Sequence, residues 1–493
     1  MAIAEKTRAT HESGSGAEDI RRRMEEVLGR QRAAFEAERP VPRKVRDDRL
    51  RRTIDLLKTH QDALAEAMNE DFCGRPPLMG KFADVLPAVK ALAHARRNLR
   101  WWMRPERRSV DFPLNLLGAK AWVSWEPKGV VGVISPWNFP VNLTFAPLAG
   151  IFAAGNRVMI KPSEFTPATS ALIAELVARY FDEAEAAVFT GGPEVGAAFA
   201  SLAFDHLLFT GATGIARHVM RAAAENLVPV TLELGGKSPA ILAPSADLDR
   251  AAYRIVAGKM MNAGQICLAP DYALVPRDKR DAFVAAVEET ASGLYPRIKD
   301  NPDYTSVINR RHKERLLGHV RDAEKKGASV RVVNPAGERF DPEDNSNVLP
   351  LHILTDVTDE MTVMQEEIFG PLLPVVGYDS LDDAIAYVNA HPRPLGLYVF
   401  GERREEIDAV LSRTISGGVT VNDVMWHVAV EDLPFGGIGP SGMGVYHGRD
   451  GFRTFSHARS VLRQPKIDLL KLSGAIPPYG RALERTLKMQ MKG

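Results

Sequence analysis

Cysteine is scarce in this chain, with only two among 493 residues. Cys73 and Cys267 stand far apart, and neither belongs to a CxxC motif or a Cys/His cluster. The spacing therefore indicates neither a zinc site nor a disulfide framework, and we expect no bound metal. Isolated thiols are typical of a reducing compartment, so we expect a cytoplasmic protein.

An excess of charge of either sign is also missing, because 63 basic side chains stand against 62 acidic ones. This balance creates no overall field that would attract nucleic acid. The stretch RRNLRWWMRPERRS, residues 96–109, does mix Arg with Trp. We interpret it as a helix end whose Arg stems lie along apolar surface, and we expect no nucleic-acid partner.

Long apolar runs are absent as well. No run approaches the roughly 18 residues that a membrane span needs, and the polar segment 1–16 lacks the apolar core of a signal peptide. The C-terminal stretch PPYGRALERTLKMQMKG, 477–493, is basic and mildly amphipathic. Membrane association of that stretch is an alternative to a surface or dimer-capping helix, which we favour. We expect a soluble protein.

Helical periodicity is present from about residue 17 to 104, after a lead-in of residues 1–16 that we expect to be flexible. From residue 120, two apolar runs flank the turn-like EPKG and predict a long hairpin. Strand-like and helical runs then alternate as far as LELGG. Such alternation predicts a parallel sheet with helices on both faces, the usual frame of a nucleotide site. A second α/β region follows, from about 237 to 420.

Two short motifs could contact a nucleotide. FTGATGIA, 209–216, follows a predicted strand and opens a helix, so its backbone N–H groups could face a phosphate, although purely steric roles for its glycines are as common. Lys161 and Glu164 in KPSE follow the strand-like RVMI. An acidic residue there could accept ribose hydroxyls and repel a 2′-phosphate, while a capping loop is the plainer alternative. ELGGKS, 233–238, is no phosphate-binding P-loop, because Thr231 stands where that motif requires glycine.

Cys267 lies in NAGQICLAP, residues 262–270. A lone cysteine is more often a small buried apolar residue than a nucleophile. Its neighbours Ala263 and Gly264 are small enough to admit a ligand, however. The amide and carboxylate that thiol-acyl chemistry requires are available in Asn138 of SPWNFP and Glu233 of LELGGKSP. Two hypotheses therefore remain for Cys267: it is a catalytic nucleophile, or it is a small buried apolar residue.

Seven motifs in order resemble the NAD(P)-dependent aldehyde dehydrogenase superfamily across residues 40–465. They are PWNFP (136–140), KPSE (161–164), FTGATG (209–214), LELGGKSP (232–239), GQICLAPDY (264–272), EEIFGP (366–371) and LPFGGIGPSGMG (433–444). The region 71–105 is most similar to the class 3 branch and its coniferyl aldehyde dehydrogenase relatives.

The resemblance implies an α/β, aldehyde dehydrogenase-like fold with three parts. These are a Rossmann-type cofactor domain over 17–111 and 129–233, an α/β catalytic domain over 234–430, and an oligomerisation hairpin formed by 112–128 and 445–466. Residues 467–493 would form a C-terminal tail. The resemblance further implies a homodimer.

It also implies roles for individual residues. Cys267 would be the nucleophile, Glu233 the general base, and Asn138 an oxyanion donor together with the backbone N–H of Cys267. Trp426 and His427 would lie near the substrate entrance, although aromatics at such a place are as often core residues. The implied cofactor-binding residues are Pro136, Trp137, Lys161, Glu164, Gly211, Ala212, Gly235, Glu367 and Phe369.

The implied reaction is oxidation of an aldehyde, aromatic or phenylpropenyl such as coniferyl aldehyde, to its acid. NAD is the expected cofactor, with NADP as a second one. The thiol of Cys267, expected to be appreciably ionised near neutrality, would attack the aldehyde, and the resulting thioester would be hydrolysed by water that Glu233 activates. Transfer to coenzyme A, a non-redox thiol esterase and a non-catalytic binding protein are the alternatives. A glutamate at position 233 argues against transfer to coenzyme A.

Overall fold

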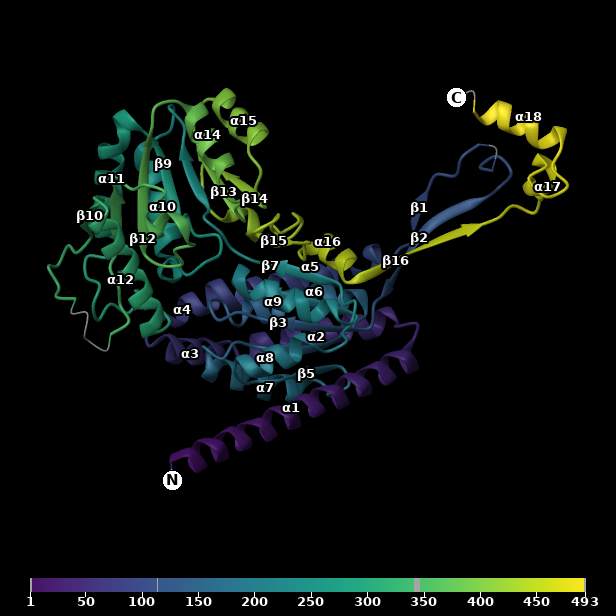
Figure 1. The fold of residues 1–493 in the computed structure, drawn as a ribbon, viewed down its shortest axis with the longest axis horizontal. Coiled ribbons are helices and arrows are strands. Elements are labelled where there is room, and N and C mark those ends of the chain that lie inside the picture. Colours follow the sequence, from purple (N-terminus) through teal and green to yellow (C-terminus); the bar gives the residue numbers. More distant parts are fainter. Residues whose placement is uncertain (1, 113, 341–345, 492–493) are drawn as a thin grey trace.

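The computed structural model describes residues 2–112, 114–340 and 346–491. It has two α/β lobes, each built around its own sheet, and a narrow arm that leaves the body (Figure 1). All strands of the first sheet except one short strand come before residue 234 in the sequence, and the first strand of the second sheet begins at Pro239. The assignment of these lobes to a cofactor domain and a catalytic domain stays a prediction.

The first sheet has six strands in the order β15-β7-β6-β3-β4-β5, and all except β15 run parallel to their neighbours. Its parallel strands are nearly continuous apolar runs, as strands covered on both faces must be. The predicted parallel sheet is therefore confirmed. Its strands are β3 (Val130–Ile134), β4 (Arg157–Lys161), β5 (Ala186–Val188), β6 (His206–Thr210), β7 (Val230–Glu233) and β15 (Gly442–Met443).

Helices cover both faces of this sheet. Alternate residues of each strand point to opposite faces, so Val131 and Val133 meet one group of helices, whereas Val130 meets another. The first group is α2 (Arg43–Thr59), α3 (Gln61–Phe72), α5 (Leu86–Trp102), α6 (Asn142–Ala154) and α7 (Pro167–Tyr180). The second group is α1 (Ala2–Glu38), α8 (Pro193–Ala200) and α9 (Thr213–Ala224). A short helix α4 (Pro77–Gly80) and a π-helical turn η1 (Lys81–Val85) precede α5.

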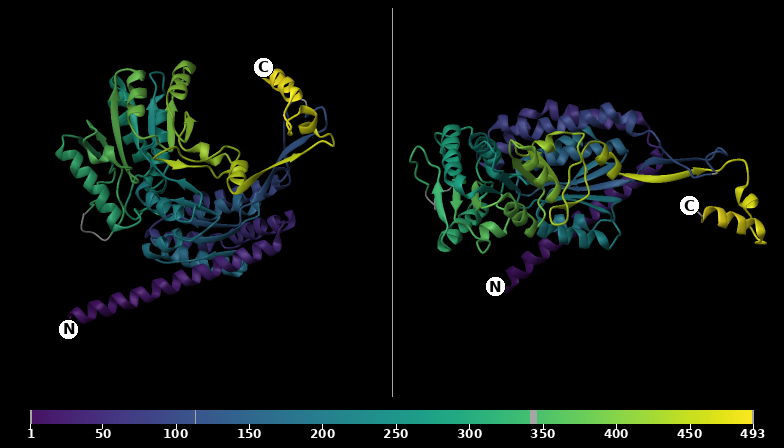
Figure 2. Two further views of the ribbon diagram at one scale, coloured as in Figure 1. Left: turned by 45° about the vertical axis from the view of Figure 1, so that its right-hand side comes forward. Right: turned by 90° about the horizontal axis from the view of Figure 1, so that it is seen from above.

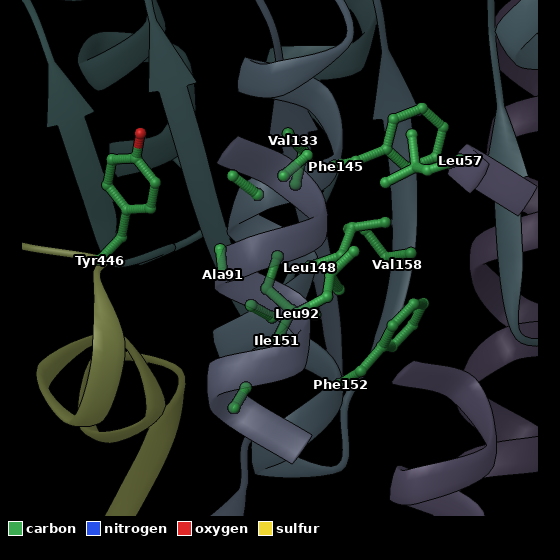
Figure 3. Packing of buried hydrophobic residues seen from close by; sticks show 14 of the residues in the cluster. Leu57, Ala91, Leu92, Val133, Phe145, Leu148, Ile151, Phe152, Val158 and Tyr446 are labelled. Carbon is green, nitrogen blue, oxygen red and sulfur yellow. The ribbon is translucent and has the colours of Figure 1, made fainter. Parts of the chain in front are cut away.

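Helix α6 lies at the centre of this core because it is apolar on every side, which only a fully buried helix can be. Figure 3 shows its side chains Phe145, Leu148, Ile151 and Phe152 among residues of strands and flanking helices. Burial of such side chains removes apolar surface from water and stabilises the fold by about 1.5–3 kcal/mol each.

Two expectations about chain organisation were wrong. The runs around EPKG do not form a hairpin: β2 (Lys120–Pro127) pairs with β1 (Glu106–Arg108) and β16 (Ser456–Arg463), whereas β3 pairs with β4 and β6. The apolar VVGVI of β3 can be buried on both faces only in the middle of a sheet, so it leaves its sequence neighbour. Helix α1 also begins at Ala2 rather than near residue 17. The flexibility of residues 1–16 stays a prediction.

The second sheet has seven strands in the order β10-β11-β12-β9-β8-β13-β14, all parallel to their neighbours except β10. Its strands are β8 (Pro239–Leu242), β9 (Tyr272–Pro276), β10 (Ser329–Val332), β11 (His352–Thr355), β12 (Leu372–Tyr378), β13 (Gly396–Phe400) and β14 (Gly418–Val421). The helices of this lobe are α10 (Leu248–Met260), α11 (Arg280–Leu294), α12 (Arg310–Lys325), α13 (Thr362–Gln365), α14 (Leu381–Ala390) and α15 (Arg404–Arg413). Single 3-10 turns occur at η2 (Met261–Gly264), η3 (Arg277–Lys279) and η4 (Trp426–Ala429).

The arm is the three-stranded sheet β1-β2-β16, which extends away from both lobes. Helix α16 (Gly448–Thr454) packs on α5 and α6 and joins the arm to the body. The chain ends beyond the arm in α17 (Leu469–Ser473) and α18 (Arg481–Gln490), which lie apart from the lobes in both views of Figure 2. Across the described residues, every helix is too short or too polar to cross a bilayer.

Candidate active site

The predicted site residues gather at the carboxyl ends of the strands of the first sheet, opposite the loops of the second lobe. Strand β3 lies between β4 and β6, so the connections after β3 and β5 lead to opposite sides of it. Open α/β sheets bind ligands at such a topological switch, in the crevice outside the carboxyl ends of the strands. The segments that follow β3, β4 and β6 carry the motifs PWNFP, KPSE and FTGATG.

Cys267 follows a strained turn at the end of α10. Asn262, Ala263 and Gly264 have φ values of 51°, 52° and 73°, all in the left-handed region. The first two carry side chains, so each costs on the order of 1–3 kcal/mol there. Gly264 cannot be larger, because a Cβ would collide with the carbonyl of Gly370. The small residues before the cysteine are thus required by backbone shape and by close packing against the EEIFGP segment.

Gln265 holds this turn in place from within the protein. Its side chain is fully buried and donates to the carbonyls of Asn262 at 2.9 Å and Ser306 at 3.0 Å, while its oxygen accepts from the N–H of Ile308 at 2.8 Å. On the other side of the cysteine, the hydroxyl of Tyr398 donates to the carbonyl of Leu268. The backbone around the sulfur is therefore fixed before any ligand binds.

Asn138 is brought to the cysteine loop by its own buried network. Its side-chain amide donates to the carbonyl of Gln265 at 3.1 Å, and its carbonyl accepts from Arg75 at 3.3 Å. Arg75 pairs at 2.6 Å with Asp84, and both side chains are completely buried. Asp84 also accepts the N–H groups of Val141 and Asn142 at the start of α6. Among the described residues the carbonyl of Gln265 is the one acceptor that the Asn138 amide has, so its second amide proton is available to a ligand.

Glu233 ends strand β7 with 2 % of its surface exposed, and neither carboxylate oxygen has a protein partner. An unpaired buried carboxylate is costly, and the group responds by holding its proton. Burial raises the pKa of Glu233 well above its usual value. Once ionised, such a carboxyl can take a proton from a bound molecule.

The Glu367 side chain lies directly over Gly235, where a Cβ would collide with it. Its Oε1 is buried without a partner, and burial raises its pKa to about 8, with the nearby Asp271 adding to the rise. Arg315 fixes the segment by donating to the carbonyls of Glu367 at 3.3 Å and Ile368 at 2.6 Å. Phe369 follows at a left-handed φ of 49°.

The ionisation state of Cys267 differs from our expectation. We expected a thiol that is appreciably ionised near neutrality. Instead, burial raises its pKa far above the usual value, and the carboxylates of Glu367 and Glu233 raise it further. The backbone N–H groups of Cys267 and Leu268 oppose this effect only partly. The free protein therefore holds a protonated thiol, and a base or a bound ligand must promote its ionisation.

Lys161 and Glu164 form an ion pair of 2.7 Å at the end of β4. Lys161 is buried, whereas Glu164 is exposed at the surface of the loop after β4. Trp137 packs edge-on against Phe369, with ring centroids 5.3 Å apart, which joins the segment after β3 to EEIFGP. Pro136, just before Trp137, is half-buried.

The segment after β6 leads into helix α9, and Ala212 is the N-cap residue of that helix. The N–H of Gly211 donates to the carbonyl of Glu233 at 3.0 Å. Ala212 and Thr213 thus present the positive end of a twelve-residue helix at the edge of the sheet.

Trp426 and His427 separate in η4. Trp426 is 55 % exposed, whereas His427 turns inward and its Nδ1 lies 2.8 Å from the Thr420 hydroxyl. Burial lowers the pKa of His427 to about 4, so the ring is neutral at physiological pH. Only Trp426 therefore stands at the surface, and the placement of either residue at a substrate entrance stays a prediction.

Cys267 lies in an apolar neighbourhood. It is partly buried and packs against the hydrophobic cluster of the first lobe, whose members include Phe139, Ile266, Phe435 and Tyr446. Met261, Met425 and Val428 are partly buried against the same cluster. This wall suits a hydrophobic substrate.

A model of the aldehyde dehydrogenase family matches residues 7–461. The chain belongs to the aldehyde dehydrogenase family. It is 58 % identical over 470 residues to a "probable coniferyl aldehyde dehydrogenase" of Caulobacter vibrioides, covering 95 % of this chain and 97 % of the relative. It is 50 % identical over 463 residues to the coniferyl aldehyde dehydrogenase of a Pseudomonas species, covering 94 % and 95 %.

Solved structures agree with this assignment. The substrate-bound AldH of Staphylococcus aureus superimposes with a TM-score of 0.87 at 35 % identity, over 95 % of this chain and 99 % of that one. A Mycobacterium tuberculosis aldehyde dehydrogenase complexed with NAD+ gives 0.80 at 29 % identity, over 90 % of each chain. The dehydrogenase is thus an oxidoreductase that oxidises aldehydes to acids with a nicotinamide cofactor, NAD or NADP.

The residues at the crevice fit such a cofactor. The orphaned Oε1 of Glu367 above Gly235 offers an acceptor for a sugar hydroxyl, and Lys161 with Glu164 offers a donor and an acceptor at the neighbouring strand. The start of α9 can face a phosphate.

Three residues escaped the sequence reasoning: Arg75, Asp84 and Gln265. Arg75 and Asp84 lie nine residues apart, and their mutual burial has no periodic signature in the sequence. Gln265 belongs to the motif GQICLAPDY and stands two residues before Cys267, which was a usable signal.

The dehydrogenase thiol is expected to ionise more readily in a Glu367→Gln variant, because the substitution removes the carboxylate that raises the pKa of Cys267 most after burial. Iodoacetamide alkylation of Cys267 should accelerate about threefold to tenfold at pH 9, and less at pH 7, where Glu367 already holds its proton. Peptide mass mapping measures the rate at this cysteine. Glu366→Gln, at the exposed neighbouring position, should leave the rate unchanged. Equal alkylation rates for the wild type, Glu367→Gln and Glu366→Gln at pH 9 would contradict the assigned effect of Glu367 on the Cys267 thiol.

Proposed function

We propose that this aldehyde dehydrogenase oxidises aromatic and phenylpropenyl aldehydes, such as coniferyl aldehyde, to the corresponding acids with NAD as the preferred cofactor. One observation supports this best: Cys267 packs against a hydrophobic cluster that includes aromatic side chains, within electrostatic reach of Glu233, whose carboxyl oxygens have no protein partner. The substrate class follows from the names of the relatives at 58 % and 50 % identity.

The chain supplies the groups for thiol-acyl chemistry. Sulfur of Cys267 attacks the aldehyde carbon, and the oxygen receives hydrogen bonds from the Asn138 amide and the backbone N–H of Cys267. Each such donor lowers a barrier by about 2.7–4 kcal/mol when it is preorganised. The Gln265 network provides that preorganisation, since it holds the loop and Asn138 together. When bound, the nicotinamide would accept the hydride.

Hydrolysis of the resulting thioester is assigned to Glu233. A carboxyl with a raised pKa is a stronger base once ionised, and its activity should increase as the pH rises above neutrality. The absence of a protein partner for either oxygen leaves both free to accept from water. Transfer of the acyl group to coenzyme A needs no base that activates water. The buried carboxyl of Glu233 therefore favours release of the acyl group to water. A thiol esterase would use the same base but would not need the acceptors at the crevice.

The remaining parts receive proposed roles on the same basis. The first lobe, 17–111 and 129–233, would bind the cofactor through Lys161, Glu164, Glu367 and the start of α9, with Trp137 and Phe369 beside the nicotinamide. The second lobe, 234–430, would carry the catalytic loop. The arm strands β2 and β16 would join two copies into a homodimer in the cytoplasm.

The dehydrogenase should reduce NAD with coniferyl or cinnamyl aldehyde, more efficiently than with short aliphatic aldehydes, because larger apolar surfaces fill the wall at Cys267. Absorbance of the reduced cofactor at steady state gives kcat/KM for each aldehyde of the panel.

Cys267→Ala should abolish aldehyde oxidation while leaving cofactor binding intact, because the substitution removes the nucleophile but leaves the residues that bind the cofactor unchanged. Cys73→Ala, at the exposed second cysteine, serves as the control and should retain full activity. Equal loss of activity in the two variants would overturn the nucleophile, and a preference for aliphatic aldehydes would overturn the substrate class.

Cofactor preference is expected to depend on Glu164, whose exposed carboxylate would repel the 2′-phosphate of NADP. Glu164→Gln should narrow the ratio of kcat/KM for NAD over NADP by about threefold to tenfold, since it removes one charge near a solvent-screened phosphate. Glu175→Gln, on the exposed side of α7, is the matched control. A wild-type preference for NADP would contradict the proposal, and an unchanged ratio in the variant would remove Glu164 as its cause.

A further inference from the structure

Asn262, in the turn before Cys267, bears two local costs. Its φ of 51° lies in the left-handed region, which asparagine tolerates better than most residues but which glycine would adopt without strain. Only 1 % of the residue is exposed, and its Oδ1 has no hydrogen-bond partner among the residues that the structure describes. A buried acceptor without a donor is destabilising. Strain and an unsatisfied atom at one position point to a role other than stability.

The amide nitrogen of Asn262, by contrast, donates twice. Its Nδ2 donates to the main-chain carbonyl of Asn138 at 3.0 Å and to the carbonyl of Gln265 at 3.3 Å. The Gln265 carbonyl is also the acceptor of the Asn138 side-chain amide, at 3.1 Å. The reverse orientation would set Oδ1 against two carbonyl oxygens, so these contacts determine which atom of the Asn262 amide faces them. Asn262 therefore holds both ends of the link between Asn138 and the cysteine loop.

These hydrogen bonds cross from one lobe to the other. Asn138 follows strand β3 of the first sheet, whereas Asn262 and Gln265 lie in the turn after α10. The Asn138 carbonyl has one further donor, the buried Arg75 at 3.3 Å. Among the described residues, loss of the Asn262 amide would leave the Asn138 carbonyl with Arg75 alone and the Gln265 carbonyl with the Asn138 side chain alone. The Asn138 side chain would then be tied to the cysteine loop at a single point.

We propose that Asn262 is a positioning residue for aldehyde oxidation, because its amide sets the direction in which the second amide proton of Asn138 points. This inference rests on the proposed function, in which Asn138 donates to the oxygen of the aldehyde. Such a donor is effective only when it is preorganised at the place where negative charge develops. A misplacement of about 1 Å can slow a reaction on the order of 10²-fold. Asn262 acts through Asn138 and forms no bond to the aldehyde itself.

Asn262→Gly removes the amide and keeps the turn, since glycine adopts a φ of 51° without strain. We measure NAD reduction in a single turnover, with the enzyme in excess over cinnamaldehyde, so that thioester hydrolysis does not limit the signal. The rate should fall about tenfold to 100-fold, because the donor of the oxyanion is misdirected. The KM for NAD should be unchanged, since the residues proposed to bind the cofactor are intact. A wild-type rate in this variant would overturn the proposal.

Iodoacetamide alkylation separates this role from a general loosening of the loop. The reagent reacts with the sulfur of Cys267 without forming an oxyanion, so it needs no donor from Asn138. The pH profile of alkylation should therefore be the same in Asn262→Gly and the wild type. A profile that shifts together with the slower oxidation would assign Asn262 to the shape of the cysteine loop and overturn its action through Asn138.

Asn138→Ala provides the decisive comparison, because residues that act as a unit have non-additive effects. The double variant Asn262→Gly/Asn138→Ala should be no slower in the single turnover than Asn138→Ala alone. Full additivity of the two effects would overturn the proposal while leaving the proposed function in place. A wild-type rate in Asn138→Ala would instead overturn the oxyanion role itself, and a wild type that reduces no NAD with any aldehyde would overturn the proposed function.

Asp356→Gly is the matched control for glycine at a left-handed position. Asp356 has a φ of 58° and pairs with Arg280 at 2.8 Å on the surface. It follows strand β11, which runs parallel to β12 and β9, whereas Cys267 precedes β9. Asp356 therefore lies at the opposite edge of the second sheet from the cysteine loop, and its variant should oxidise cinnamaldehyde at the wild-type rate. Equal slowing in Asp356→Gly and Asn262→Gly would overturn the specific role of Asn262.

Discussion

Three acid groups, the thiol of Cys267 and the carboxyls of Glu233 and Glu367, are buried together, and burial makes each of them hold its proton. The Glu367 and Glu233 carboxylates raise the pKa of the Cys267 thiol further. The free protein is consequently a protonated, chemically quiet state. A thiol in such a site becomes nucleophilic when a ligand or a rise in pH promotes its ionisation.

The fold withstands this unfavourable burial because the surrounding backbone is fixed by other contacts. The left-handed turn at 262–264, the Gln265 network and the Arg75–Asp84 pair all stabilise the loop from outside the acid cluster. A buried ion pair contributes little net stability but is expensive to break, so Arg75 and Asp84 act more as a constraint on position than as a source of stability. The two lobes supply the opposing walls, with Glu233 on the first sheet and Cys267 and Glu367 on loops of the second lobe.

Much of the fold could be predicted from the sequence because long apolar strands and amphipathic helices have regular periods. The parallel sheet over 130–233 and the second α/β region follow from that pattern, and the motif order identified the family. The hairpin at EPKG was wrong, because local apolar runs do not reveal which strand becomes central. Proximity to Cys267 was predictable only through family motifs, as with Glu233 and Asn138. Arg75 and Asp84 come to support the site through helix packing, and the ionisation state of Cys267 depends on burial, which no sequence period encodes.

The central claim is that Cys267 carries an acyl group which Glu233 releases to water. Its most direct test is rapid mixing of Glu233→Gln with NAD and cinnamaldehyde above neutral pH, followed by intact-protein and peptide mass spectrometry. We expect a burst of reduced cofactor near one equivalent per site, then a slow steady phase, with a cinnamoyl adduct on Cys267. Loss of a positioned base should slow the steady phase by about 10²–10⁴-fold. Absence of both burst and adduct, with the folded variant still binding NAD, would contradict it.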